Sequence, residues 1–92
     1  MNNAPSPVDP FVAEYLLGHA RSTILRNFLE CPAMSLSVHD MRSRSGVSEI
    51  AVRRELKALT ELGLLTSSRA APRRYKVADG HPAMQGLIQL LR

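Results

Sequence analysis

Apolar residues recur at helical spacing in two neighbouring stretches near the start of the chain. The first stretch comprises Phe11, Val12, Tyr15 and Leu16. The second comprises Ile24, Leu25, Phe28 and Leu29. Gly18 lies between them and marks either a break between two helices or a kink in one, and Pro32 ends the second helix. Residues 1–8 have two prolines and no periodic pattern, so we expect a disordered lead there and a folded domain over 9–92.

Two more helices are predicted in the middle of the chain, on either side of Gly46. The run Ser37-Val38-His39-Asp40 has the form of a capping box, which begins the shorter helix. Ser48 caps the longer helix, and Gly63 follows its end. The apolar positions of the longer helix share one face and are Val52, Leu56, Leu59 and Leu62. The opposite face is mainly basic and comprises Ile50, Arg54, Lys57 and Glu61, with Arg53 at its flank.

A hairpin and a last helix are predicted for the remainder. Short strands are expected over residues 64–68 and 73–77. Their connection, residues 69–72, contains a proline and no glycine, which argues against a tight two-residue turn. A helix over 82–92 follows, and its apolar positions are Met84, Leu87, Ile88 and Leu91. The pattern therefore predicts a mainly α fold with a small β-hairpin.

Basic residues are concentrated in the centre of the chain. The formal net charge is +4 and the sequence pI is about 10.0. Residues 39–77 hold nine Lys and Arg against four Asp and Glu, so this stretch carries +5 and the remainder −1. A basic centre between near-neutral ends is typical of a protein that binds a polyanion, most often nucleic acid. A solvated, arginine-rich surface is the alternative.

Composition narrows the class of protein. A chain of 92 residues, 45% hydrophobic and only 4% aromatic, makes one small domain with an aliphatic core. No apolar run approaches the roughly 18–20 residues of a membrane-spanning helix, and the N-terminus lacks the pattern of a signal peptide. Cys31 is the single cysteine, so no intrachain disulfide can form, and we expect a cytoplasmic protein.

Residues 37–63 have the spacing of a helix-turn-helix, and residues 64–77 add a basic hairpin directly after it. The segments that form a larger pattern are SVHDM (37–41), SGVS (45–48), VRRELKAL (52–59), ELGLL (61–65), RRYKV (73–77) and HP (81–82). Over about residues 18–91 the chain resembles the winged helix-turn-helix transcription regulators of the ArsR/MarR type. It is most similar to the winged-helix modules that precede some nucleotidyltransferase domains. The resemblance implies a three-helix core with a wing and terminal helices.

This resemblance implies a sequence-specific regulator of transcription that binds double-stranded DNA. The recognition helix, residues 48–62, is expected in the major groove, and the basic wing, residues 69–76, on the backbone or in the minor groove. The expected DNA-binding residues are Ser48, Arg53, Arg54, Lys57, Arg69, Arg73, Arg74 and Lys76. We also expect a homodimer through the N- and C-terminal helices, because the apolar stripes over 11–16 and 84–91 exceed what the small core needs.

Another class of function fits the same fold. The domain is then an adaptor that binds a separate enzyme, such as a nucleotidyltransferase or a toxin, and does not bind DNA. Binding of single-stranded RNA is a weaker option, because readers of RNA stack bases on aromatic side chains. Tyr75 is the only aromatic residue of the basic stretch.

Neither catalysis nor metal or cofactor binding is predicted. Ser37, His39 and Asp40 lie on one helical turn and cannot converge as a catalytic triad. A zinc or copper site needs three or four converging ligands, whereas Cys31 is single and the histidines, His19, His39 and His81, fall in separate elements. We expect Cys31 to be half-buried at a helix end. The methionines expected to fill the core are Met34, Met41 and Met84.

Overall fold

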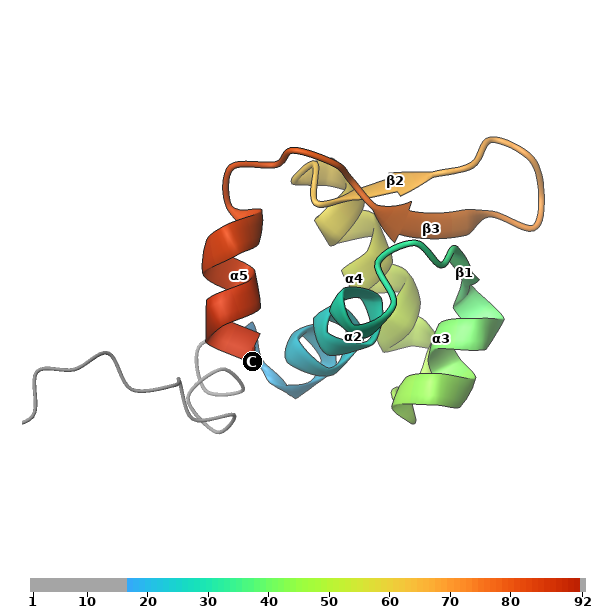
Figure 1. Cartoon of the computed structure of the whole chain (residues 1–92). Helices are drawn as coiled ribbons and strands as arrows, with labels where there is room; N and C mark the ends of the chain where they lie inside the picture. The colour runs from blue at the N-terminus through green and yellow to red at the C-terminus, as the bar shows by residue number, and fades with distance from the viewer. Residues whose placement is uncertain (1–16, 92) are drawn as a thin grey trace, which may run out of the picture.

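The computed structural model describes residues 17–91, so the predicted lead over 1–8 and the predicted helix over 11–16 lie outside the described residues. Within 17–91 the chain forms four helices and a three-stranded sheet (Figure 1). In chain order the elements are α2 (His19–Glu30), β1 (Leu36–Ser37), α3 (Val38–Ser45), α4 (Glu49–Glu61), β2 (Leu65–Ser67), β3 (Arg74–Val77) and α5 (Met84–Leu91). None of these helices is long and apolar enough to cross a bilayer. The prediction of a mainly α fold with a small β-hairpin is confirmed, and a third strand adds to the hairpin.

Helix α2 starts after a break in the chain. Gly18 has φ +87° and ψ 153°, a conformation that glycine adopts readily and that no α-helix contains. The alternative of one kinked helix through Gly18 is therefore excluded. The helix ends at Glu30, where Cys31 is half-buried as expected. Ile24, Leu25 and Phe28 are all at most 3% exposed, so the predicted apolar stripe faces the core.

Local hydrogen bonds begin α3 as the sequence predicts. The Ser37 hydroxyl accepts a hydrogen bond from the backbone N–H of Asp40 at 3.1 Å. The Asp40 carboxylate in turn accepts one from the backbone N–H of Ser37 at 3.0 Å. The helix ends at Gly46, whose φ of +70° lets its N–H reach the carbonyl oxygen of Arg42. Both ends of the helix are thus fixed by residues within one turn.

Helix α4 buries the predicted apolar face, with one exception. The Ser48 hydroxyl accepts a hydrogen bond from the backbone N–H of Ala51 at 3.3 Å and caps the helix. The buried positions that were predicted are Val52, Leu56 and Leu59. The expectation that Leu62 extends this face is wrong, because Leu62 is 57% exposed. The helix ends at Glu61, and the turn at Gly63 directs Leu64 into the core instead.

The sheet joins the hairpin to the start of α3. Its strand order is β1-β3-β2, with both pairs antiparallel. The predicted hairpin is present, but both strands are shorter than predicted: β2 lacks residues 64 and 68, and β3 lacks residue 73. The loop between the two strands is longer than a two-residue turn, as the missing glycine indicated. Strand β1 was not predicted, and it pairs Leu36 with Tyr75 and Ser37 with Arg74.

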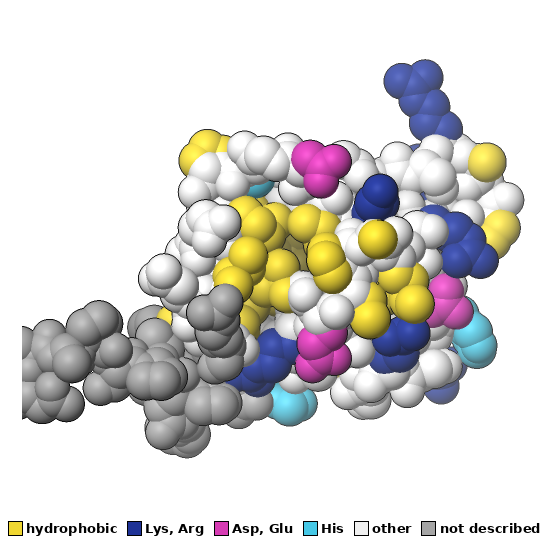
Figure 2. Space-filling model, in the orientation of Figure 1, with side chains coloured by type: hydrophobic (Ala, Val, Ile, Leu, Met, Phe, Trp, Pro, Cys, Tyr) yellow, Lys and Arg dark blue, Asp and Glu magenta, His cyan; other side chains and the backbone are white. Residues whose placement is uncertain are grey.

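Helix α5 packs on the side of α2 (Figure 1). Leu91 is buried in the core, and the half-buried residues that pack against the core are Met84, Leu87 and Leu90. Part of the apolar stripe that we expected in a dimer interface is thus used inside the chain. Ile88, which is only half-buried, lies at a hollow of about 270 Å³ that is lined by Arg26, Leu29, Glu30, Ile88 and Leu91. Figure 2 shows apolar side chains gathered between α5 and α2.

Candidate nucleic-acid interface

The outward face of α4 is exposed and mostly basic. The side chains of Arg53 and Arg54 are 62% and 68% exposed, and Lys57 is exposed as well. Ile50, which shares this face, is also exposed. Ile50, Arg54 and Lys57 lie on the far side of the helix from Val52, and Arg53 lies at the flank, as the spacing of 100° per residue predicts. The sequence prediction of a cationic outer face on this helix is therefore confirmed.

A groove separates the second half of α4 from the hairpin. It has a volume of about 440 Å³ and is lined by Arg53, Lys57, Thr60, Glu61, Ser67, Arg73 and Tyr75. A second groove of about 440 Å³ continues toward the start of α3 and is lined by Ser37, Val38, His39, Glu49, Arg53, Pro72, Arg73 and Tyr75. Arg53, Arg73 and Tyr75 line both, so the two grooves adjoin, and together they are called here the α4–hairpin groove. It brings cations from two elements onto one surface.

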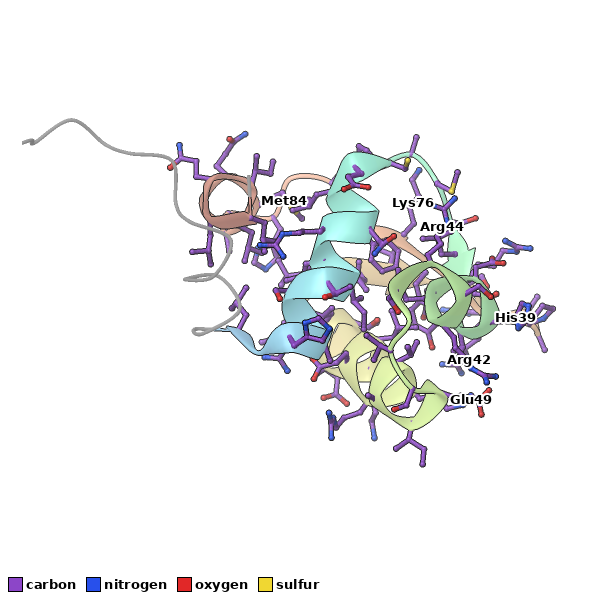
Figure 3. The ribbon with its side chains drawn as sticks, turned by 90° about the horizontal axis from the view of Figure 1, so that it is seen from below. His39, Arg42, Arg44, Glu49, Lys76 and Met84 are labelled. Atoms are coloured by element: carbon purple, nitrogen blue, oxygen red, sulfur yellow. The ribbon has the colours of Figure 1, made fainter. Side chains whose placement is uncertain are left out.

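The basic residues of the hairpin divide between the two faces of the sheet. Side chains alternate along a strand, and in β3 Tyr75 and Val77 are half-buried whereas Arg74 and Lys76 are exposed. Arg73, two residues before Tyr75, lines the α4–hairpin groove with it. Arg74 and Lys76 therefore lie on the face of the sheet that turns away from α4. In Figure 3, Lys76 lies well apart from Glu49 at the start of α4.

Arg74 is engaged with the start of α3. Its Nη1 atom is 3.5 Å from Oδ2 of Asp40 and donates a hydrogen bond to the carbonyl oxygen of Ser35 at 3.4 Å. The hydrogen bonds with Ser37, first the one from its backbone N–H, together with the charges of Arg74 and His39, hold the pKa of Asp40 below its ordinary value. Arg74 thus ties β3 to the capped end of α3, and its position fits a structural role.

A second tie joins α2 to α4 and was not predicted. Nε of Arg21 lies 2.6 Å from Oε2 of Glu55, whose side chain is only 10% exposed. The other carboxylate oxygen of Glu55 is 3.7 Å from Nε of Arg54. Glu55 is therefore a buried carboxylate with an arginine on each side. The sequence carried a signal for it, since Glu55 lies only about 60° from the centre of the apolar face of α4.

Carboxylates also lie within the basic surface. Oε2 of Glu49 is 3.8 Å from Nε of Arg53, one helical turn away. Glu49 and Glu61 line the two ends of the α4–hairpin groove. They reduce the positive potential of the groove, because the contributions of nearby charges add. The groove residues with positive charge are Arg53, Lys57 and Arg73.

The remaining predicted residues lie outside the α4–hairpin groove. The hydroxyl of Ser48 is used to cap α4, and Arg69 is exposed in the loop between β2 and β3.

Met34 is 39% exposed, so the prediction that it fills the core is wrong. It lies on the surface segment that leads from α2 to β1, where its sulfur accepts a hydrogen bond from Nη2 of Arg44 at 3.2 Å. Met41 is fully buried, as expected.

The candidate chemical groups around the start of α3 and before α5 have structural roles or are exposed. Ser37 and Asp40 use their side chains to cap α3, and His39 is exposed. His81 holds the turn before α5, where its Nδ1 accepts a hydrogen bond from the backbone N–H of Ala83 at 3.0 Å. Among residues 17–91, no three His, Cys, Asp or Glu side chains lie close enough to hold a metal ion.

Comparison with known proteins adds no assignment. No protein-family model matches the sequence, and no curated protein gives a significant match. The function is therefore inferred from the geometry and charge of the surface described above.

Proposed function

We propose that this chain is a winged helix-turn-helix domain that binds double-stranded DNA as a sequence-specific regulator of transcription. The observation that carries the proposal is the α4–hairpin groove, in which Arg53, Lys57 and Arg73 line one surface. The order of elements supports it, because a short capped helix precedes α4 and a hairpin follows it. In such domains the second helix of the pair enters the major groove.

The dimensions of α4 suit this docking. Its 13 residues give a length of about 20 Å at 1.5 Å per residue, and a major groove about 12 Å wide admits one helix. With α4 in the major groove and the hairpin toward the next minor groove, the phosphate backbone that separates the two grooves runs through the α4–hairpin groove. Arg53, Lys57 and Arg73 then contact phosphates, and Arg54, farther round the helix, faces base edges.

This docking revises the roles expected from the sequence. Arg53, expected only as one of the DNA-binding residues of the recognition helix, is assigned to phosphate binding, since it lines the groove together with Arg73. Arg74 and Lys76 lie on the other face of the sheet and make no contact with the same backbone strand. Arg69, at the end of the hairpin, remains free to approach the minor groove. The direct readout of the base sequence is thus assigned to the residues of α4 that project farthest from the core, among them Arg54.

We further propose that the domain works as a homodimer through its terminal helices. The hollow between α2 and α5, with Leu29 and Ile88 in its lining, supplies apolar surface on the described part of that interface. A two-fold axis there sets two recognition helices about 34 Å apart, one turn of DNA. Light scattering at micromolar concentration should give twice the chain mass of 10.2 kDa. A particle of one chain mass at every concentration contradicts the dimer.

Binding of the wild-type protein to a random duplex tests the proposed function. Fluorescence anisotropy at about 50 mM salt should show micromolar or tighter binding that weakens steeply toward 200 mM, because counterions are released from the DNA. A single-stranded RNA of equal length, added as competitor, should displace the protein poorly. A folded protein that binds no duplex at low salt contradicts the proposal and favours the adaptor function. Genomic footprinting then identifies the operator.

A further inference from the structure

The most exposed large apolar side chain of the described chain lies at the start of α4. Ile50 is 80% exposed, compared with 57% for Leu62 and 39% for Met34. It occupies the first turn of the helix, and Arg54 and Lys57 follow it on the same face at i+4 and i+7. An isoleucine therefore stands within the cationic face, on the line of the helix that projects farthest from the core.

The surroundings of Ile50 do not form an apolar patch for a protein partner. The other exposed large apolar residues lie on different parts of the fold: Leu62 follows the opposite end of α4, and Met34 lies before β1. Twelve residues of helix place Ile50 and Leu62 about 18 Å apart along the axis. Single exposed apolar residues do not make a protein interface. The immediate neighbours of Ile50 on its face are charged, which favours a polyanionic partner.

We propose that Ile50 is a specificity-determining residue that contacts the C5 methyl group of a thymine in the major groove. This inference rests on the proposed DNA-binding function and names the base that one position of the helix recognises. The thymine methyl is the apolar group that a base pair displays on its major-groove edge. Ile50 lies between Arg53 and Arg54, which attract phosphates and base acceptors. A duplex therefore offers a partner to the two arginines and to the isoleucine at the same time.

The size of the effect follows from the burial of one methyl group. Burying a CH₂-sized group contributes about 0.8 kcal/mol, which is about fourfold in affinity. Loss of the thymine methyl or truncation of Ile50 should each lower affinity by about this factor. The two losses should not multiply, because each removes the same contact.

A thymine-to-uracil scan tests the assignment. Wild-type protein first selects a duplex from a random pool, and each thymine of that duplex is then replaced by uracil, one position at a time. Wild-type protein should lose about fourfold in affinity at one thymine of each half-site. Ile50→Ala should bind the thymine and uracil duplexes equally at that position. Leu62→Ala, the truncation of another exposed apolar residue beyond the other end of α4, should keep the wild-type discrimination.

The outcomes separate the two levels of the proposal. Failure to select any duplex overturns both the DNA-binding function and the role of Ile50. Selection of a duplex whose uracil variants all bind like the parent overturns the role of Ile50 alone. The same conclusion follows when Ile50→Ala still discriminates thymine from uracil. Circular dichroism of Ile50→Ala checks that the helix is intact, which the high exposure of this residue leads us to expect.

Discussion

Arginines in two regions of this small domain carry the same charge in different surroundings. In the α4–hairpin groove, Arg53 and Arg73 line an open depression between two elements. At the two ties, Arg21 and Arg74 reach carboxylates on other elements, Glu55 in α4 and Asp40 in α3. Neighbouring arginines of one hairpin, at 73 and 74, thus belong to different regions. The comparison teaches that a count of basic residues overstates the charge that is available to a partner.

The tie between α2 and α4 should show the largest effect on stability. Arg21→Ala leaves the buried carboxylate of Glu55 without its partner at 2.6 Å, and we expect a loss of about 1–3 kcal/mol in the free energy of unfolding. Arg54→Ala should change it by less than about 0.5 kcal/mol, because this side chain is largely exposed. Urea denaturation measures both. Equal losses in the two variants contradict the distinction.

The interaction of Asp40 with Ser37 and Arg74 should affect the pH dependence of stability. The pKa of Asp40 is lower in the folded protein than its ordinary value, first through the backbone hydrogen bond from Ser37. Its contribution is therefore complete above the unfolded pKa of about 3.9 and is lost as the pH falls through the folded value. Asp40→Asn should flatten this acid limb of the stability profile, and Arg74→Ala should flatten it partly. If Asp40→Asn loses stability at acid pH as the wild type does, the loss is caused by other groups.

The acidic residues inside the basic surface should limit binding to random DNA. Glu49 lies 3.8 Å from Arg53, where it offsets part of the attraction between that arginine and a phosphate. Glu49→Gln should raise the affinity for a random duplex by about two- to threefold, a change of about 0.5 kcal/mol that is typical of exposed ion pairs. Anisotropy at low salt measures it. Asp79→Asn, an exposed change in the turn after β3, is the control and should have no effect; weaker binding by Glu49→Gln contradicts the prediction.

Features set by neighbours in sequence were predictable. The capping box at Ser37 and Asp40, the cap at Ser48 and the end of α3 at Gly46 each involve residues within four positions. The buried face of α4 follows from helical spacing for the same reason. The prediction that Leu62 is buried was wrong because helical spacing fixes the direction of a side chain only within the helix. Leu62 follows the last helical residue, where the chain changes direction.

Features set by distant pairs were not predictable from one sequence. Strand β1 is two residues long, and its partner in β3 lies nearly forty residues later. The tie between Arg21 and Glu55 spans 34 positions. The placement of the hairpin cations on two faces could have been predicted, because the alternation of side chains along a strand already separates Arg73 from Arg74. That signal was present in the sequence and would have narrowed the list of candidate DNA contacts.

The central claim is that the α4–hairpin groove binds the phosphate backbone, and the salt dependence of binding tests it most directly. The logarithm of the binding constant for a random duplex is measured against the logarithm of salt concentration for the wild type, Arg73→Ala and Arg74→Ala. Arg73→Ala should reduce the steepness of this line by about 0.9, the value for one lost phosphate contact. Arg74→Ala removes the same charge one residue away and should leave the slope unchanged. Equal slopes for the wild type and Arg73→Ala, or equal reductions in the two variants, contradict the account.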